Sequence, residues 1–264
     1  MKCFVKFLIS ACLIALLGSG VGCGNDASKA AAPVSVSVPL PVPLTNMVRI
    51  SAGTFQRIRF PVTLTRDFWI GKYEGTQGEF QTVMGLNPSH FTGLSNHPVE
   101  KVSFVAASNY CVKVTTQERG HGHLPEGFEY RLPTEAEWEF ACRAGSTNRF
   151  YFGPTPEGGD AHAWTAENCE ATTHPVGAKK PNAWGLHDMH GNVWEWCKDT
   201  YNGKTLRNLD GDHTSDREGG ADRIFRGGSY LNSPSFARAG FRFSYAPGRR
   251  LPSLGLRPAM AVLP

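Results

Sequence analysis

Runs of β-branched and aromatic residues that alternate with polar residues mark the strands that the sequence predicts. Residues 62–70 alternate in this way and predict one strand. Residues 47–50 predict an earlier strand, which leads into a turn at residues 53–55. Beyond Arg143 the apolar positions lose any regular period, so mostly loops and short strands are expected there.

Three segments carry helical signals. Residues 76–84 are compatible with a helix, and residues 103–116 place apolar positions at helical spacing after a serine that can act as the N-cap. Thr134, with a glutamate three residues later, forms a capping box that opens a helix over residues 135–143, and Gly145 is expected to end it. Two main helices with short strands and long loops predict an α+β domain. The 29 glycines and 18 prolines favour the same loop-rich class.

The N-terminal segment has the pattern of an export signal. Lysines at positions 2 and 6 precede an apolar run over residues 7–17, which is too short to span a bilayer. Small residues follow directly, and then Cys23. This order predicts a signal peptide over residues 1–22 and lipid modification of Cys23, so that the protein is exported and anchored to a membrane, with its domain on the outer surface. An ordinary signal peptide with an incidental cysteine is the alternative.

A single composition shift separates the N-terminal segment from the rest of the chain. Residues 23–46 are rich in Pro, Ala, Ser and Val without a helical period, which predicts an extended, lipidated tether. One globular domain is expected over residues 47–264. The formal net charge of +4 comes without any Lys/Arg-rich run, which argues against nucleic acid as a partner.

Four cysteines remain in the predicted domain. Export permits disulfides, and four cysteines allow three full pairings among which the sequence does not choose. No pair has CxxC spacing, so a cysteine zinc site is not expected. Buried thiols and one or two structural bridges both stay open for Cys111, Cys142, Cys169 and Cys197.

Four motifs in a fixed order carry a resemblance to a known family. They read YRLPTEAEWEFA at residues 130–141, PNAWGLHDMHGNVWEWC at 181–197, RGGSY at 226–230 and GLR at 255–257. In order and spacing they resemble the formylglycine-generating-enzyme, or sulfatase-modifying-factor, family. The resemblance implies a C-type-lectin-like α+β fold with little regular structure. The indole rings of these motifs suit a core built largely from loops, and core packing is expected of Trp138, Trp184, Trp194 and Trp196.

The resemblance also implies a possible structural calcium ion. In the family the GNVWEW stretch binds calcium, and hard oxygen ligands at the matching positions are what calcium prefers. The alternative is that these groups bond to loop backbone without a metal, and no cofactor is required by the sequence. The matching positions are Asp188, Gly191, Val193 and Glu195.

The family's oxidase chemistry depends on two cysteines that this chain lacks. They follow the RGGSY element, bind copper and form a disulfide with substrate; Asn232 and Ala237 stand in their places. Neither side chain can form a thiolate or exchange disulfides. An iron-dependent branch of the family needs a histidine triad from an added N-terminal domain, which a proline-rich tether does not supply. No catalytic residue is therefore assigned, and the alternative is a family enzyme, active or degenerate.

The segment from 231 to 257 has an unusual composition. It contains no Lys, Glu, Gln, Met or Trp, and these are the residues whose codons end only in A or G. When the two adenines of an Asn codon (AAY) are randomised, the result is an NNY codon, with any base at the first two positions and a pyrimidine at the third. NNY codons cannot encode any of these five residues. Fixed anchors such as Ala237, Gly240 and Arg242 are interspersed. The pattern resembles the variable proteins of diversity-generating retroelements, which use the same lectin-like domain; a family member with a drifted active site is the alternative.

A variable region over about residues 230–257 implies a diversified binding site for an unknown protein or surface ligand. Aromatic residues beside arginine are typical of recognition surfaces, although core packing is a strong alternative for Phe236. The anchors Arg238, Arg242 and Arg257 are expected to pair with carbonyls or carboxylates inside the domain. The predicted ligand-binding positions are Leu231, Asn232, Ser233, Ser235, Phe236, Phe241, Phe243, Ser244, Tyr245, Arg249, Leu251, Pro252 and Ser253.

Overall fold

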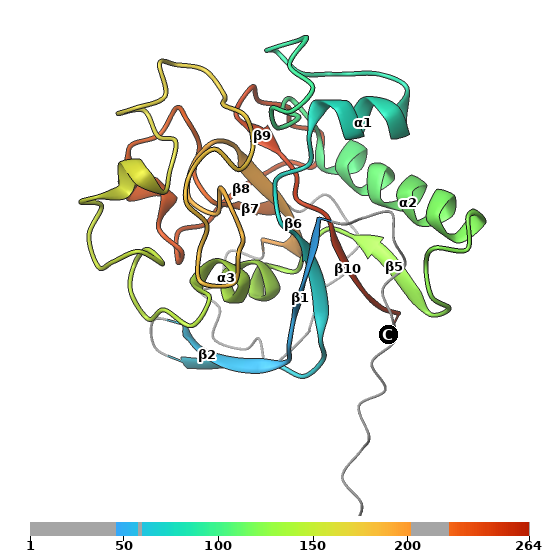
Figure 1. Ribbon diagram of the computed structural model, residues 1–264, viewed down its shortest axis with the longest axis horizontal. Helices are drawn as coiled ribbons and strands as arrows, with labels where there is room; N and C mark the ends of the chain where they lie inside the picture. The colour runs from blue at the N-terminus through green and yellow to red at the C-terminus, as the bar shows by residue number, and fades with distance from the viewer. Residues whose placement is uncertain (1–45, 58–59, 202–221, 264) are drawn as a thin grey trace, which may run out of the picture. The chain divides into compact units, whose positions relative to one another are not determined.

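A computed structural model describes residues 46–57, 60–201 and 222–263 (Figure 1). The predicted signal peptide, the lipidation site Cys23 and the tether up to residue 45 lie outside these described residues. Among the helices of the described ranges, none is long and apolar enough to cross a membrane.

An antiparallel sheet joins the two ends of the domain (Figure 1). Its order is β1-β4-β10-β5, so the last strand of the chain lies between strands from the first half. Ala259 pairs with Ile70 on one side and with Arg131 on the other. The strands are β1 (Met47–Ile50), β4 (Phe68–Gly71), β5 (Phe128–Arg131) and β10 (Ala259–Val262).

Two strand predictions need correction. The expected turn at residues 53–55 is instead the start of strand β2 (Gly53–Arg57), which pairs with β3 (Phe60–Leu64). The single strand expected over 62–70 is split into β3 and β4, because the chain turns before Asp67 and each part pairs with a different partner. Asp67 Oδ1 accepts the Ala52 N–H at 2.8 Å and fixes this turn.

The three helices begin where the sequence predicts. Thr76 and Thr134 each form a complete capping box, and Ser103 Oγ accepts the Ala106 N–H. The third helix ends at Arg143, and its C-cap Ala144 adopts the left-handed conformation with φ 44°, one residue before the expected Gly145. The described chain thus has three α-helices where two main ones were expected: α1 (Gln77–Met84), α2 (Phe104–Gly120) and α3 (Glu135–Arg143).

The second sheet carries the candidate site. Its order is β8-β7-β6-β9, with β6 and β9 parallel and the other pairs antiparallel. Helix α3 packs against β6 and β7, and the predicted tryptophans fill the core: Trp138 and Trp196 are fully buried, Trp194 nearly so, and Trp184 packs at the edge. The strands are β6 (Trp194–Thr200), β7 (Arg223–Arg226), β8 (Phe243–Tyr245) and β9 (Leu254–Gly255).

Candidate functional site: an aromatic surface on a charged frame

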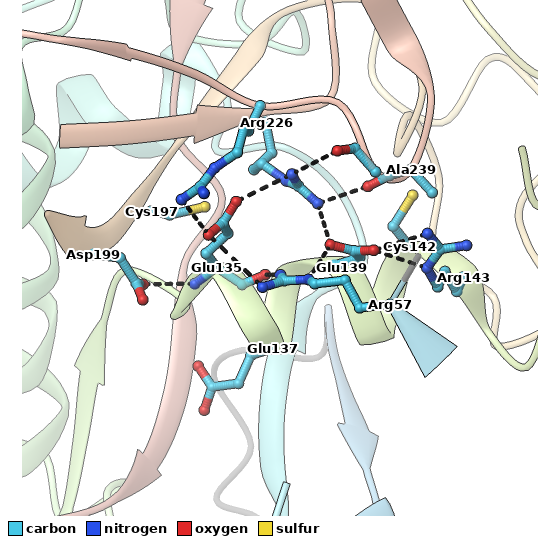
Figure 2. Close-up of polar contacts among 12 residues, drawn as sticks. Arg57, Glu135, Glu137, Glu139, Cys142, Arg143, Cys197, Asp199, Arg226 and Ala239 are labelled. Atoms are coloured by element: carbon cyan, nitrogen blue, oxygen red, sulfur yellow. Dashed lines mark hydrogen bonds and ion pairs between the residues drawn. The ribbon is translucent and has the colours of Figure 1, made fainter. Parts of the chain in front are cut away.

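A buried ion network lies between α3 and β7 (Figure 2). Arg226 bonds to Glu135 at 3.1 Å and to Glu139 at 2.6 Å. Glu139 also accepts from Arg57 at 2.7 Å and from Arg143 at 2.8 Å. Burial opposes ionisation of Glu139, but the guanidiniums of Arg226, Arg57 and Arg143 hold its pKa below the ordinary value. The network therefore fixes α3 to the strands that support the C-terminal segment.

Two of the three anchor arginines pair as the sequence predicts. Arg242 Nη2 bonds to Glu135 at 2.7 Å. Arg257 is fully buried and holds Glu195 through two nitrogens, at 2.7 and 3.0 Å to Oε1. Trp138 Nε1 donates to the other oxygen of Glu195 at 2.6 Å. These pairs tie the middle and the C-terminal end of the predicted variable segment to the core.

The RGGSY element packs closely against the start of the predicted variable segment. Gly228 has φ +77°, and a Cβ there would lie 2.8 Å from the Cα of Ala237. Only glycine allows this close approach without strain. The short 3₁₀ turn Pro234–Ala237 therefore packs on the element, and the Ala237 carbonyl accepts from His190 Nδ1 at 2.6 Å.

The predicted ligand-binding positions form a largely exposed surface. All of them are at least partly exposed except Ser253. Phe236, Phe241, Phe243 and Tyr245, which we call the aromatic row, contact one another in sequence with ring centroids 5.1, 6.4 and 5.7 Å apart. Phe243 is 44% exposed and Phe236 is 37% exposed, so the core role considered for Phe236 is not observed.

Buried rings support the aromatic row from below. Phe225 stacks on Phe243 and on Tyr245, with centroids 5.7 and 5.6 Å apart. Trp194 contacts Phe241 at 6.1 Å and packs edge-on against Phe225. Because Phe225 and Trp194 are buried, the row has one fixed inner face and one free outer face.

Arg238 does not follow the prediction for the anchors. Its guanidinium lies over the Phe241 ring at 5.5 Å, and no carboxylate or carbonyl partner of Arg238 is found within the described residues. Arg249 lies over Tyr245 at 5.3 Å in the same way. Both arginines thus add positive charge to the aromatic surface, and the half-exposed position of Arg238 explains why it needs no buried partner.

Two predicted ligand-binding positions are tied to the scaffold. Ser253 is buried directly before β9, and its carbonyl accepts the Trp194 N–H at 2.8 Å, so it does not belong to the exposed surface. Asn232 is only partly exposed, and its Oδ1 accepts from Trp194 Nε1 at 2.9 Å and from Ser229 Oγ at 2.6 Å.

The residues predicted to bind calcium are arranged for other contacts. Both Glu195 oxygens already accept from Arg257 and Trp138, which leaves the carboxylate little capacity for a cation. Asp188 is better suited, because its Oδ1 is buried without a hydrogen-bond partner among the described atoms, and burial raises its pKa to about 6. Glu195 thus does not fit a calcium ligand in this arrangement, and calcium binding stays a prediction.

A carboxylate that the sequence did not reveal lies beside this stretch. Glu74 accepts from the Val193 N–H at 3.0 Å and from Asn192 Nδ2 at 2.6 Å. Burial, with the nearby charges of Asp188 and Glu195, raises its pKa well above the ordinary value. Nothing in its local sequence indicates this role, since its partners lie more than a hundred residues away.

The four cysteines of the domain are buried free thiols. Burial raises the pKa of Cys111 to about 12 and also raises the pKa of Cys142 and Cys197. Reactive cysteines need the thiolate form, so these three are poor nucleophiles at neutral pH. Among the open possibilities for the cysteines, the structure shows buried thiols.

A possible metal site lies at the end of α2. Glu118, His121 and His123 place one ligand atom each within 4.8 Å of the others, and no other group of three His, Cys, Asp or Glu residues does so in the described ranges. This group was not among the residues predicted from the sequence. The available signal was the His-Gly-His triplet at residues 121–123, which follows Glu118 closely.

Solved structures confirm the fold class. The domain resembles Treponema denticola variable protein 1 with a TM-score of 0.73 and 30% identity, covering 83% of this chain and 95% of that one. It also resembles PvdO from Pseudomonas aeruginosa, with a TM-score of 0.69, 28% identity and coverage of 82% and 94%. The predicted α+β, C-type-lectin-like architecture is therefore correct.

Sequence relatives point to the same family. The chain is 32% identical over 259 residues to the chaperone protein LppX of Paenibacillus barcinonensis, covering 80% of this chain and 88% of LppX. It is 38% identical over 187 residues to the formylglycine-generating enzyme of Streptomyces coelicolor, covering 64% of this chain and 54% of the enzyme. The chain thus spans only about half of that enzyme. Residues 34–262 match the sulfatase-modifying factor enzyme 1-like domain, and the chain belongs to this family.

Proposed function

We propose that the chain is an exported binding protein that presents its C-terminal segment as a ligand-binding surface and performs no catalysis. The observation that carries this proposal is the aromatic row. Phe236 and Phe243 are exposed and Phe241 and Tyr245 are partly exposed. All but Phe236 rest on the buried rings of Trp194 or Phe225. An exposed set of aromatic side chains of this size is unusual for a solvated surface and typical of an interface.

The rigid support beneath the row favours binding affinity. Aromatic side chains have few rotatable bonds, so they lose little conformational entropy when a ligand covers them. The ion pairs of Arg226, Arg242 and Arg257 hold the surrounding backbone before any ligand arrives. A preorganised surface of this kind converts more of its contact energy into affinity.

Two observations support diversification of the surface. The segment from 231 to 257 contains only residues that NNY codons can encode. The fold and 30% identity shared with Treponema denticola variable protein 1 agree with the same role. The ligand in this proposal is an unidentified protein or surface molecule, and nucleic acid is not expected.

The location follows from the N-terminal pattern. The proposal includes a lipid on Cys23 that anchors the protein to a membrane, with the domain outside the cell. Such an anchor would place the aromatic row where it meets external partners.

The alternative function is catalysis of the family type, and the 38% identity to a formylglycine-generating enzyme favours it. Against it stand Asn232 and Ala237, which occupy the places of the two reactive cysteines. The discriminating assay incubates the purified protein with a sulfatase-motif peptide, copper and oxygen, and detects aldehyde. We expect no turnover above a control without protein, and any turnover would contradict the proposal.

Binding is tested with a phage-displayed random peptide library. Clones selected on the purified protein are tested on a variant in which the two exposed rings of the row are changed to serine (F236S/F243S). We expect most clones to lose binding while the circular dichroism spectrum stays native-like, because changes at exposed sites cost little stability. Clones that bind both proteins equally, or a variant that unfolds, would show that the row is ordinary packing.

A further inference from the structure

A cavity of about 570 Å³ opens beside the aromatic row. Its walls come from the end of α3 and the loop after it, from β2 and from the predicted variable segment. The side chains that matter for its chemistry are Gln56, Arg143, Arg149, Arg238, Phe241 and Arg242. The volume is in the range of known ligand pockets.

The cavity carries an excess of positive charge. Two carboxylates, Glu135 and Glu139, form ion pairs with the guanidiniums of four arginines: Arg57, Arg143, Arg226 and Arg242. Each carboxylate can neutralise only one positive charge. Asp199, whose charge also acts on Arg57 and Arg242, is a third carboxylate, so the four arginines keep a formal surplus of one. Burial, together with repulsion from the other arginines of the network, lowers the pKa of Arg242 despite its bond to Glu135.

Two further arginines in the cavity wall are uncompensated. Arg149 is exposed and Arg238 is partly exposed, and neither forms an ion pair with a described residue. No acidic side chain is among the described residues that line the cavity. The planar fork of a guanidinium suits carboxylate and phosphate groups, which bind it through paired hydrogen bonds.

We propose that this cavity binds a carboxylate-bearing segment of a protein partner. The inference rests on the proposed binding function and adds the chemical class of the ligand. Phe241 belongs both to the aromatic row and to the cavity wall, so the two surfaces are continuous. A partner that covers the row with apolar side chains would place an adjacent Asp or Glu against Arg149 and Arg238. The apolar contacts supply area, and the arginines select for negative charge.

The test measures binding of a fluorescent hexaglutamate peptide by anisotropy, with hexaglutamine as the neutral control. We expect R149Q/R238Q to weaken hexaglutamate binding about tenfold or more, which corresponds to about 1.4 kcal/mol or more, since the variant removes two charge-assisted contacts. The matched control is R66Q/K113Q, which removes two exposed positive charges that do not line the cavity. Melting temperatures verify that both variants are folded.

Four outcomes would overturn the inference. Equal losses in both double variants would indicate non-specific charge attraction. If hexaglutamate does not bind at all, the cavity is not a binding site for carboxylates. Inorganic phosphate that competes fully and binds as tightly as hexaglutamate would point to a small-anion site instead of an acidic protein segment. If library-selected peptides depend on the aromatic row but not on Arg149 and Arg238, the proposed function stands and the cavity inference alone fails.

A second inference comes independently from the end of α2. His123 Nδ1 and Glu118 Oε2 face each other at 3.3 Å, yet both atoms are buried without any hydrogen-bond partner among the described atoms. Backbone bonds hold this arrangement, because the His121 and His123 N–H groups donate to the carbonyls of Gln117 and Glu118. In a zinc tetrahedron with bonds of about 2.0–2.1 Å, neighbouring ligand atoms lie about 3.3 Å apart, which matches the His123–Glu118 pair. The three ligand atoms together lie within 4.8 Å of one another, so His121 closes the site by a small side-chain movement.

The geometry points to a divalent zinc site formed by Glu118, His121 and His123, with water as the fourth ligand. The purified protein is loaded with ZnCl₂, dialysed against metal-free buffer and analysed for zinc, and its melting temperature is measured with and without the metal. We expect one zinc ion more per chain in the wild type than in H121Q or H123Q, and a zinc-dependent rise in melting temperature that both variants lose. H90Q, which changes an exposed histidine elsewhere, should behave like the wild type. Equal zinc content in all four proteins would overturn the inference.

Discussion

Trp194 Nε1 donates a hydrogen bond to Oδ1 of Asn232 at 2.9 Å. The same oxygen accepts from Ser229 Oγ at 2.6 Å, and the Asn232 backbone N–H donates to the Ser229 carbonyl at 3.0 Å. From the sequence resemblance, Asn232 is expected to take the place of a reactive cysteine of the family's enzymes. Here the carboxamide completes the hydrogen bonding of a nearly buried indole beneath the aromatic row. Position 232 is therefore part of the scaffold, even though asparagine is one of the residues that NNY codons can encode.

Substitution of Asn232 should destabilise the domain. N232A leaves Trp194 Nε1 without its partner, and an unsatisfied buried donor costs about 1–3 kcal/mol. S233A changes the exposed neighbour and should shift the free energy of unfolding by less than about 0.5 kcal/mol. Urea unfolding of both variants measures the difference, and equal midpoints would show that Asn232 is a freely variable surface residue.

Local signals in the sequence predicted the framework of the fold. The capping box predicted at Thr134 and the serine cap predicted at Ser103 both form, because a cap depends only on residues within one turn. A second capping box, at Thr76, was not predicted. The family motifs correctly placed Trp138 and Trp196 in the core. Arg242 and Arg257 were expected to find polar partners, since a buried guanidinium is costly without them.

Features that depend on distant residues could not be predicted. The alternating pattern of residues 62–70 hides a turn, because nothing local shows that β3 pairs with β2 while β4 pairs with β1 and β10. Glu74 lies 119 residues from its partner Val193. The cavity likewise combines Gln56, Arg149 and Arg238 from three distant segments. The sequence identified the aromatic residues and the arginines next to them in the chain, but not Arg143 and Arg149, which come from outside the predicted variable segment.

Removal of calcium should leave the fold intact. Arg257 and Trp138 already satisfy Glu195, so we expect the melting temperature to be the same in millimolar EGTA and in millimolar calcium. By contrast, E195Q should lower the free energy of unfolding by about 3–5 kcal/mol, because it leaves the Arg257 charge buried without its counter-ion. Differential scanning calorimetry tests both statements. A lower melting temperature in EGTA that calcium restores would establish the family's metal site in this chain.

Loss of Cys23 should release the protein from the membrane. The apolar run and the small residues before Cys23 predict lipid attachment at this thiol. C23S should incorporate no labelled fatty acid and should appear in the soluble fraction, whereas C12S, within the predicted signal peptide, should be labelled like the wild type. Metabolic labelling in an expression host with lipoprotein processing provides the measurement. Label that persists in C23S would place the anchor elsewhere.

The stability of the domain should depend on pH through Glu100. This side chain is fully buried; its Oε1 accepts the Phe91 N–H at 2.9 Å, while Oε2 has no hydrogen-bond partner among the described atoms. Burial raises its pKa from 4.5 to about 7. The folded state therefore keeps a proton that the unfolded chain releases over this range. The resulting stabilisation is complete below pH 4.5 and is lost as the pH rises to 7.

The variant E100Q isolates this effect, because glutamine has a similar shape and no titratable group. The free energy of unfolding of E100Q relative to wild type should increase between pH 5 and 7, by at most about 1.4 kcal/mol per pH unit, and should level off above pH 8. The free energy of unfolding of E167Q, a change at an exposed position, should follow the same pH dependence as that of the wild type. Urea unfolding at intervals of half a pH unit gives the three curves. A wild-type curve parallel to that of E100Q from pH 5 to 8 would mean that Glu100 is ionised in the folded protein and must find a partner for its second oxygen.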